Sequence, residues 1–155
     1  MKLSNSEITK KIEDAKKFQR LGKFKDAEKI YADTLKNNSN SFDLPFSYAL
    51  FSKDLKNYIL AKKLLVNLTK KFPSEIRPYI QIADILTLEN RYSEAEQVLL
   101  IAKNIEPKNS DVLYNFSRLY WSGKNFELSL KYINKAIELR SEEHTSELQS
   151  LTNLV

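Results

Sequence analysis

With 155 residues and a hydrophobic fraction of 42%, the chain is long enough to bury a core, and only two glycines and four prolines favour helices over a turn-dense all-β fold. The absence of cysteine excludes disulfides and thiolate metal sites. Although the net charge is +5, bases alternate with acids along most of the chain, so we do not expect nucleic acid as a partner. The polar start and the lack of an apolar run of about 18 residues predict a cytoplasmic protein without a membrane span.

A period of 34 residues organises the chain after a short lead-in at residues 1–7, where Ser4 and Glu7 have the spacing of a helix capping box. Four aromatic residues follow one another in steps of 34, and each precedes a very small residue by three positions. They are Phe24, Tyr58, Tyr92 and Phe126. A period of this length is typical of repeat architectures. We therefore divide the chain into units at residues 8–41, 42–75, 76–109 and 110–139.

Each unit is predicted to contain two helices of about a dozen residues, because apolar residues recur at helical spacing on both sides of a short break. Small residues occupy positions 8 and 20 of every unit and would let the paired helices approach closely, with the aromatic residue at position 17 wedged beside the crossing. The small residues are Ala15, Ala49, Ala83 and Ser117 at position 8, and Ala27, Ala61, Ala95 and Ser129 at position 20.

Turn and capping residues mark the helix ends. The breaks inside the first and fourth units contain Gly22 and Gly123, and the third unit repeats the capping-box spacing at Ser93 and Glu96. Between units, Pro73 and Pro107 are 34 residues apart and indicate turns. Pro45 and Pro78 are predicted in the first turn of the following helices, where a missing N–H is least costly.

With these residues in phase, the chain resembles an array of four tetratricopeptide repeats over residues 8–139. The resemblance implies an all-α fold, a right-handed α-solenoid (superhelix) of antiparallel helix pairs. The first unit departs from the family pattern, with Lys11 and Asp14 where large apolar residues are usual and Ser39 in place of proline. Because one face of a terminal repeat meets water, we interpret these departures as capping.

The last sixteen residues, 140–155, break the repeat. Residues 140–150 look like the in-frame translation of a sequencing-library adapter, and we interpret the tail as an artefact. The alternative is a native helical tail, because Leu148, Leu151 and Val155 lie at helical spacing. On the first interpretation the fourth repeat is truncated at residue 139, and the natural protein is expected to continue with further repeats or another domain.

No catalytic constellation is visible in the sequence. The only histidine, His144, lies in the tail, so the usual pairs of nucleophile and base are missing, and two glycines provide no phosphate-cradling loop. No cluster of side chains has metal-ligand spacing. The sequence therefore predicts no enzyme activity, no cofactor and no metal.

The resemblance implies that the first helices of the units line a concave groove that binds a partner. Charged members of the groove are also expected to pair with one another, Arg77 with Asp43, and Arg118 with Asp84 or Asp111. We expect Trp121 to be the main anchor, and its alternative role is packing against a next repeat. The groove residues carried over from the family are Ile12, Lys16, Arg20, Asp43, Phe46, Leu50, Lys53, Arg77, Ile80, Asp84, Leu88, Asp111, Tyr114, Arg118 and Trp121.

These features predict a protein–protein interaction module, a scaffold that binds a partner peptide or helix in its groove. The alternative is the N-terminal targeting arm of a larger, truncated enzyme such as a transferase. A third hypothesis is self-association through the uncapped last repeat.

Overall fold

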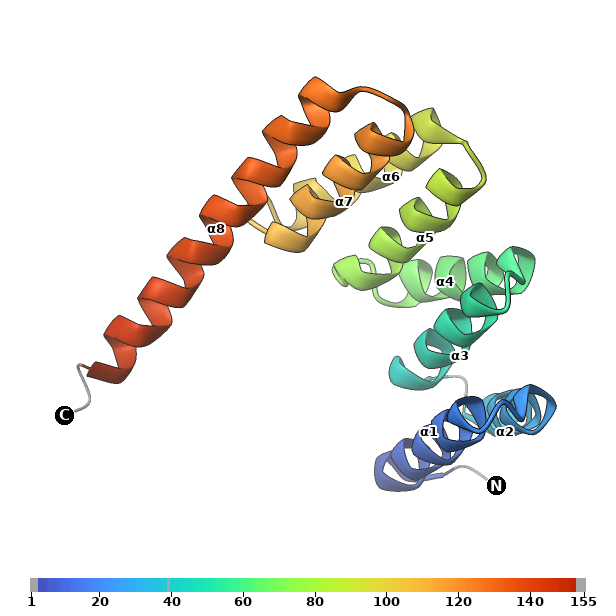
Figure 1. Cartoon of the computed structure of the whole chain (residues 1–155). Coiled ribbons are helices and arrows are strands. Elements are labelled where there is room, and N and C mark those ends of the chain that lie inside the picture. The colour runs from blue at the N-terminus through green and yellow to red at the C-terminus, as the bar shows by residue number, and fades with distance from the viewer. Residues whose placement is uncertain (1–2, 39, 153–155) are drawn as a thin grey trace. The chain divides into compact units, whose positions relative to one another are not determined.

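The computed structural model of the chain describes the backbone of residues 3–38 and 40–152, and their side chains except those of residues 143, 144 and 146–152. All regular secondary structure in this part of the chain is α-helix, which confirms the predicted all-α class (Figure 1). The helices fall into two compact units, the first ending at Pro73 and the second beginning at Ser74. Ser39, which replaces the proline of the repeat pattern, lies outside the described residues.

The first unit consists of two helix pairs, and each pair is joined by a three-residue turn. The helices are α1 (Asn5–Arg20), α2 (Phe24–Asn37), α3 (Asp43–Asp54) and α4 (Tyr58–Lys71). Besides the contacts within the pairs, α3 contacts both α1 and α2. The predicted capping box is confirmed: the Ser4 hydroxyl accepts the Glu7 N–H at 3.3 Å and the Glu7 carboxylate accepts the Ser4 N–H at 2.8 Å. Because Ser4 caps α1, the last three of the seven predicted lead-in residues, 5–7, are helical.

The second unit repeats this plan. Its helices are α5 (Ile76–Leu88), α6 (Tyr92–Ile105), α7 (Ser110–Ser122) and α8 (Phe126–Thr152), and α7 contacts both α5 and α6. The prediction of a capping box at Ser93 and Glu96 is wrong, because α6 already begins at Tyr92 and its N-cap, Arg91, has no side-chain capping bond. The Arg91 guanidinium instead donates to both carboxylate oxygens of Glu94, at 2.7 and 2.6 Å.

Helix α8 continues without interruption beyond residue 139, where the repeat pattern stops in the sequence. Arg140, the first residue of the predicted tail, donates to a carboxylate oxygen of Asp111 on α7 at 2.9 Å, and both side chains are exposed. The side chains of His144, Leu148 and Leu151, and the whole of Val155, lie outside the described part of the chain. The adapter origin of the tail stays a prediction.

The predicted helix crossings are confirmed by the burial of the small residues. The alanines at positions 8 and 20 are at most 1% exposed. In the last pair, Ser117 and Ser129 replace them, and the Ser129 hydroxyl lies 2.9 Å from the Ser117 carbonyl oxygen and 3.1 Å from the Ser117 hydroxyl. These mutual hydrogen bonds satisfy the hydroxyls, so two polar side chains are accommodated at the crossing of α7 and α8.

The aromatic residues of the core are not those at position 17. Phe24 and Phe126 are 47% and 55% exposed at the starts of α2 and α8, so the prediction that they wedge beside the crossing is wrong for both. Tyr31 instead stacks on Tyr48 at a centroid distance of 5.4 Å in the first unit. The Tyr31 hydroxyl donates to Gln19 at 3.0 Å, and burial raises the pKa of Tyr31 to about 12.

In the second unit, Phe116 stacks on Tyr132 at 4.8 Å, and both rings pack against Tyr120. The Tyr120 hydroxyl donates to Glu96 on α6 at 2.5 Å. Burial and this hydrogen bond to a carboxylate both raise the pKa of Tyr120, because each disfavours the phenolate. The aromatic cluster thus joins α6, α7 and α8.

Every first helix ends in the same left-handed turn. In each, two backbone hydrogen bonds of the Schellman type close the helix, for example from Gly22 N to Gln19 O and from Lys23 N to Phe18 O, both 2.9 Å. The residue with positive φ occupies the same position in all four units. These residues are Gly22, Lys56, Asn90 and Lys124, with φ between 59° and 70°.

The two glycines are therefore expected to respond oppositely to alanine. Gly22→Ala places a side chain at φ +70° and should lower the free energy of unfolding by about 1–2 kcal/mol. Gly123 has φ −78°, and a Cβ there would meet the nearest atom at an ordinary 3.5 Å, so Gly123→Ala should raise stability by about 0.4–1 kcal/mol. Urea unfolding followed by circular dichroism measures both, and changes of the same sign would contradict the assignment of the turn.

Candidate functional site

The predicted groove residues separate into buried and exposed ones. Ile12 and Ile80, two of the predicted groove residues, are only 6% and 8% exposed and so offer little surface to a partner. Both occupy the fifth position of their 34-residue repeat and lie on a first helix that contacts the next first helix in its unit, α1 with α3 and α5 with α7. They belong to the core. Tyr114 occupies the same position on α7, the last first helix of the described chain, and is 46% exposed.

The first-helix face of the first unit mixes charge with apolar surface. Lys16, Arg20 and Asp43 are exposed, whereas Phe46, Leu50 and Lys53 are half-buried. The Phe46 ring stacks on Phe42 at 5.4 Å, and Phe42 in turn meets the edge of Phe72 at 5.4 Å. Phe46 thus packs on Phe42, which Phe72 supports in turn, and keeps part of its surface open.

In the second unit, the predicted pairing of Arg118 is confirmed with Asp84. The guanidinium lies 2.8 Å from the Asp84 carboxylate, which is 10% exposed, while Arg118 remains 45% exposed. The other predicted acid, Asp111, binds Arg140. Arg77 pairs with Glu75 beside it at 2.8 Å, and its pairing with Asp43, which would join the two units, stays a prediction.

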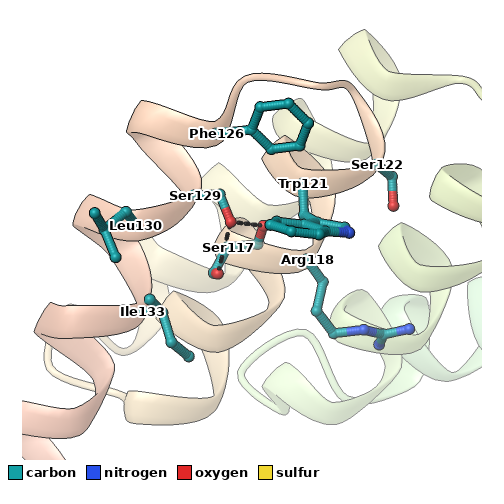
Figure 2. A pocket seen from close by; sticks show the side chains of 8 residues that line it. All are labelled: Ser117, Arg118, Trp121, Ser122, Phe126, Ser129, Leu130 and Ile133. Atoms are coloured by element: carbon teal, nitrogen blue, oxygen red, sulfur yellow. Dashed lines mark hydrogen bonds between the residues drawn. The ribbon is translucent and has the colours of Figure 1, made fainter.

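An apolar hollow of about 350 Å³ opens between α7 and α8, as Figure 2 shows. Its residues come from both helices: Ser117, Arg118, Trp121 and Ser122 from α7, and Phe126, Ser129, Leu130 and Ile133 from α8. Since Ser117 and Ser129 bond to each other, their hydroxyls need no further partner. We call this site the α7–α8 hollow.

Trp121 borders the α7–α8 hollow and is its most exposed large residue. It is 65% exposed, and its indole meets the Phe126 ring at 5.0 Å with an interplanar angle of 65°. Leu130 on α8 is 61% exposed. Exposed apolar surface gathered around a recess is typical of an interaction site.

Sequence reasoning missed the contribution of α8 to this site, because the family resemblance places groove residues on first helices alone. A signal was nevertheless present. Leu130 occupies a position that holds Glu28, Lys62 and Glu96 in the other three units. An apolar residue at a position where the other repeats have charged residues indicates that this face of α8 has a different role from the same face of the other second helices.

The described residues contain no group of three or more histidine, aspartate or glutamate side chains that could hold a metal ion. None of the described helices combines the length and the apolar character that crossing a membrane requires.

Comparison with known proteins connects this architecture to a family. Residues 110–143 match the tetratricopeptide repeat model, and a comparison with curated protein sequences gave no match. A crystal structure of MamA has a TM-score of 0.72 at 12% identity and covers 89% of this chain and 81% of its own. MamA MSR-1 has a TM-score of 0.66 at 19% identity, with 81% and 72% covered. At these identities the likeness shows the fold.

The matched segment begins at Ser110, the first residue of α7, and spans the turn and the start of α8 that form the hollow. The family match thus identifies residues 110–143 as a tetratricopeptide repeat, and the likeness to MamA shows that the chain shares its fold.

Proposed function

We propose that the chain is a protein–protein interaction scaffold that binds a peptide or helix of a partner on its first-helix faces, with Trp121 as the main anchor. The observation that carries this proposal is a tryptophan 65% exposed at the edge of a preformed apolar hollow. Aromatic and arginine side chains usually dominate binding energy at such surfaces. A hollow that exists before binding also lowers the entropy cost of association.

Charge on the same face would set the orientation of the partner. Asp84 holds the Arg118 guanidinium beside the hollow, where it can meet carboxylate or carbonyl oxygens of the partner. Excluding the two buried isoleucines, the proposed contact residues are Lys16, Arg20, Asp43, Phe46, Leu50 and Lys53 in the first unit, and Arg77, Asp84, Leu88, Asp111, Tyr114, Arg118 and Trp121 in the second.

Affinity capture from cell extract, followed by titration of the captured partner, tests the anchor. Trp121→Ala is expected to weaken binding at least about tenfold, the range of an interface hot spot. Phe46→Ala tests the first unit in the same way. Leu100→Ala is the matched control, because Leu100 is 44% exposed but lies on the second helix α6. Recovery of the same partner by all variants with equal affinity would contradict binding through the first-helix faces.

A further inference from the structure

The two units differ in net charge, and the net charge of +5 for the whole chain conceals this difference. The first unit contains 16 lysines and arginines against eight acids, whereas the second contains nine against twelve. Their net charges are therefore +8 and −3. A surplus of this size favours encounter of the first unit with an anionic partner.

The basic unit also has an apolar recess away from the first-helix face. Two adjoining hollows, of about 330 and 120 Å³, share the lining residues Leu35 on α2 and Leu64 and Asn67 on α4. Buried residues of α3 also line them, Tyr48 the larger and Pro45 the smaller. We call the two hollows together the α2–α4 groove, and its apolar lining comes mainly from second helices.

Three lysines line this groove. Lys36 and Lys63 line the larger hollow and Lys71 lines the smaller one, while neither lining includes a carboxylate. The Lys36 ammonium pairs with Asp33 on the same helix at 2.7 Å, but the two side chains are 70% and 53% exposed. Exposed pairs of this kind contribute little to stability, so a carboxylate of a partner can compete for Lys36.

In the second unit, an aromatic side chain occupies the place that corresponds to the α2–α4 groove of the first. In the 34-residue register, Leu64 of α4 corresponds to Tyr132 of α8. The Tyr132 ring stacks on Phe116 at 4.8 Å, and the Lys103 ammonium lies 5.9 Å from its centroid. Because Leu64 is smaller than tyrosine, the first unit keeps room beside α3 for an apolar side chain of a partner.

We propose that the α2–α4 groove is a second docking site that binds an acidic segment of a partner protein. Its apolar side chains enter the two hollows, and its carboxylates meet the lysines around them. A recess between helices fits the projecting side chains of a polypeptide, whereas a membrane surface requires apolar groups that project from the protein. The site is separate from the Trp121 surface, so the chain can hold two segments.

Binding of a designed probe tests this site. The probe is a fluorescent helical peptide with leucines on one face and glutamates elsewhere, and its counterpart has lysine for every glutamate. Fluorescence anisotropy should show that Lys36→Glu with Lys63→Glu weakens binding of the acidic probe at least about tenfold, and that the basic probe binds at least about tenfold more weakly. Raising the salt concentration should weaken binding as well.

The matched control is Lys10→Glu with Lys17→Glu, which changes the net charge equally on exposed positions of α1 outside the groove. It should weaken binding by no more than about threefold. Trp121→Ala should leave probe binding unchanged, so that failure of this proposal and failure of the Trp121 anchor give different results. Chemical shifts of the Asn67 side-chain amide should move on titration.

The proposal is overturned if both double variants lose affinity equally, if Trp121→Ala abolishes binding, or if no acidic-probe binding is detected at millimolar concentration. It is also overturned if the lysines of the groove instead mediate binding to anionic vesicles or to a second copy of the chain, measured by co-sedimentation and light scattering.

Discussion

Phe116→Ala is expected to lower the free energy of unfolding by about 3–5 kcal/mol. Phe116 is fully buried on α7, and its ring stacks on Tyr132 of α8 at 4.8 Å and on Tyr120 at 6.2 Å. Truncation removes apolar area from the core and leaves a cavity among rings that cannot close it without moving whole helices. Urea unfolding followed by circular dichroism measures the loss.

The matched control for Phe116 is Tyr114, two residues earlier on the same helix. Since Tyr114 is 46% exposed, Tyr114→Ala should change stability by no more than about 1 kcal/mol. Similar losses for the two variants would contradict the burial pattern of α7. The same pair separates folding from binding, because only Tyr114 belongs to the proposed contact surface.

Leu65→Ala is expected to lower the free energy of unfolding by about 2–5 kcal/mol. Leu65 is 1% exposed on α4 and occupies the repeat position that also buries Tyr31 and Leu99. Its neighbour Val66 is 40% exposed, so Val66→Ala should cost less than about 1 kcal/mol. Thermal unfolding of both variants tests whether α4 turns the predicted face inward, and a larger loss for Val66→Ala would show that it does not.

The helix pairs and their crossings could be predicted because one period repeats in register. Ala27, Ala61 and Ala95 lie 34 residues apart, and all three have no exposed surface. Four in-phase copies of a small residue leave little ambiguity between helix and strand, since the flanking apolar residues keep helical spacing. Local helix starts were less certain: Ser4 caps α1 as predicted, whereas Ser93 lies inside α6.

Which apolar residues of the repeats are buried and which are exposed was harder to predict. Periodicity marks a residue as apolar and in phase, but it does not tell whether another helix covers it. Ile12 and Ile80 are covered by the next first helix and are buried, while Phe24 and Phe126 stand at helix starts and are half-exposed. Periodicity alone predicts neither case, because burial depends on tertiary neighbours and not only on sequence position.

The split in charge between the units could have been read from the sequence, because it needs only the boundary between the second and third repeats. The hollows could not, since they depend on how side chains of α2 and α4, or of α7 and α8, fill the space between helices. Likewise, nothing in the residue types Lys56 and Lys124 indicates a left-handed backbone; only their register with Gly22 does.

Trp121 is the only tryptophan of the chain, so its fluorescence reports on the α7–α8 hollow without labelling. In dilute, partner-free protein we expect red-shifted emission that acrylamide quenches strongly, with little further red shift when urea unfolds the chain, because the indole is 65% exposed. Blue-shifted emission protected from acrylamide in the folded monomer would contradict an open anchor at this end of the repeats.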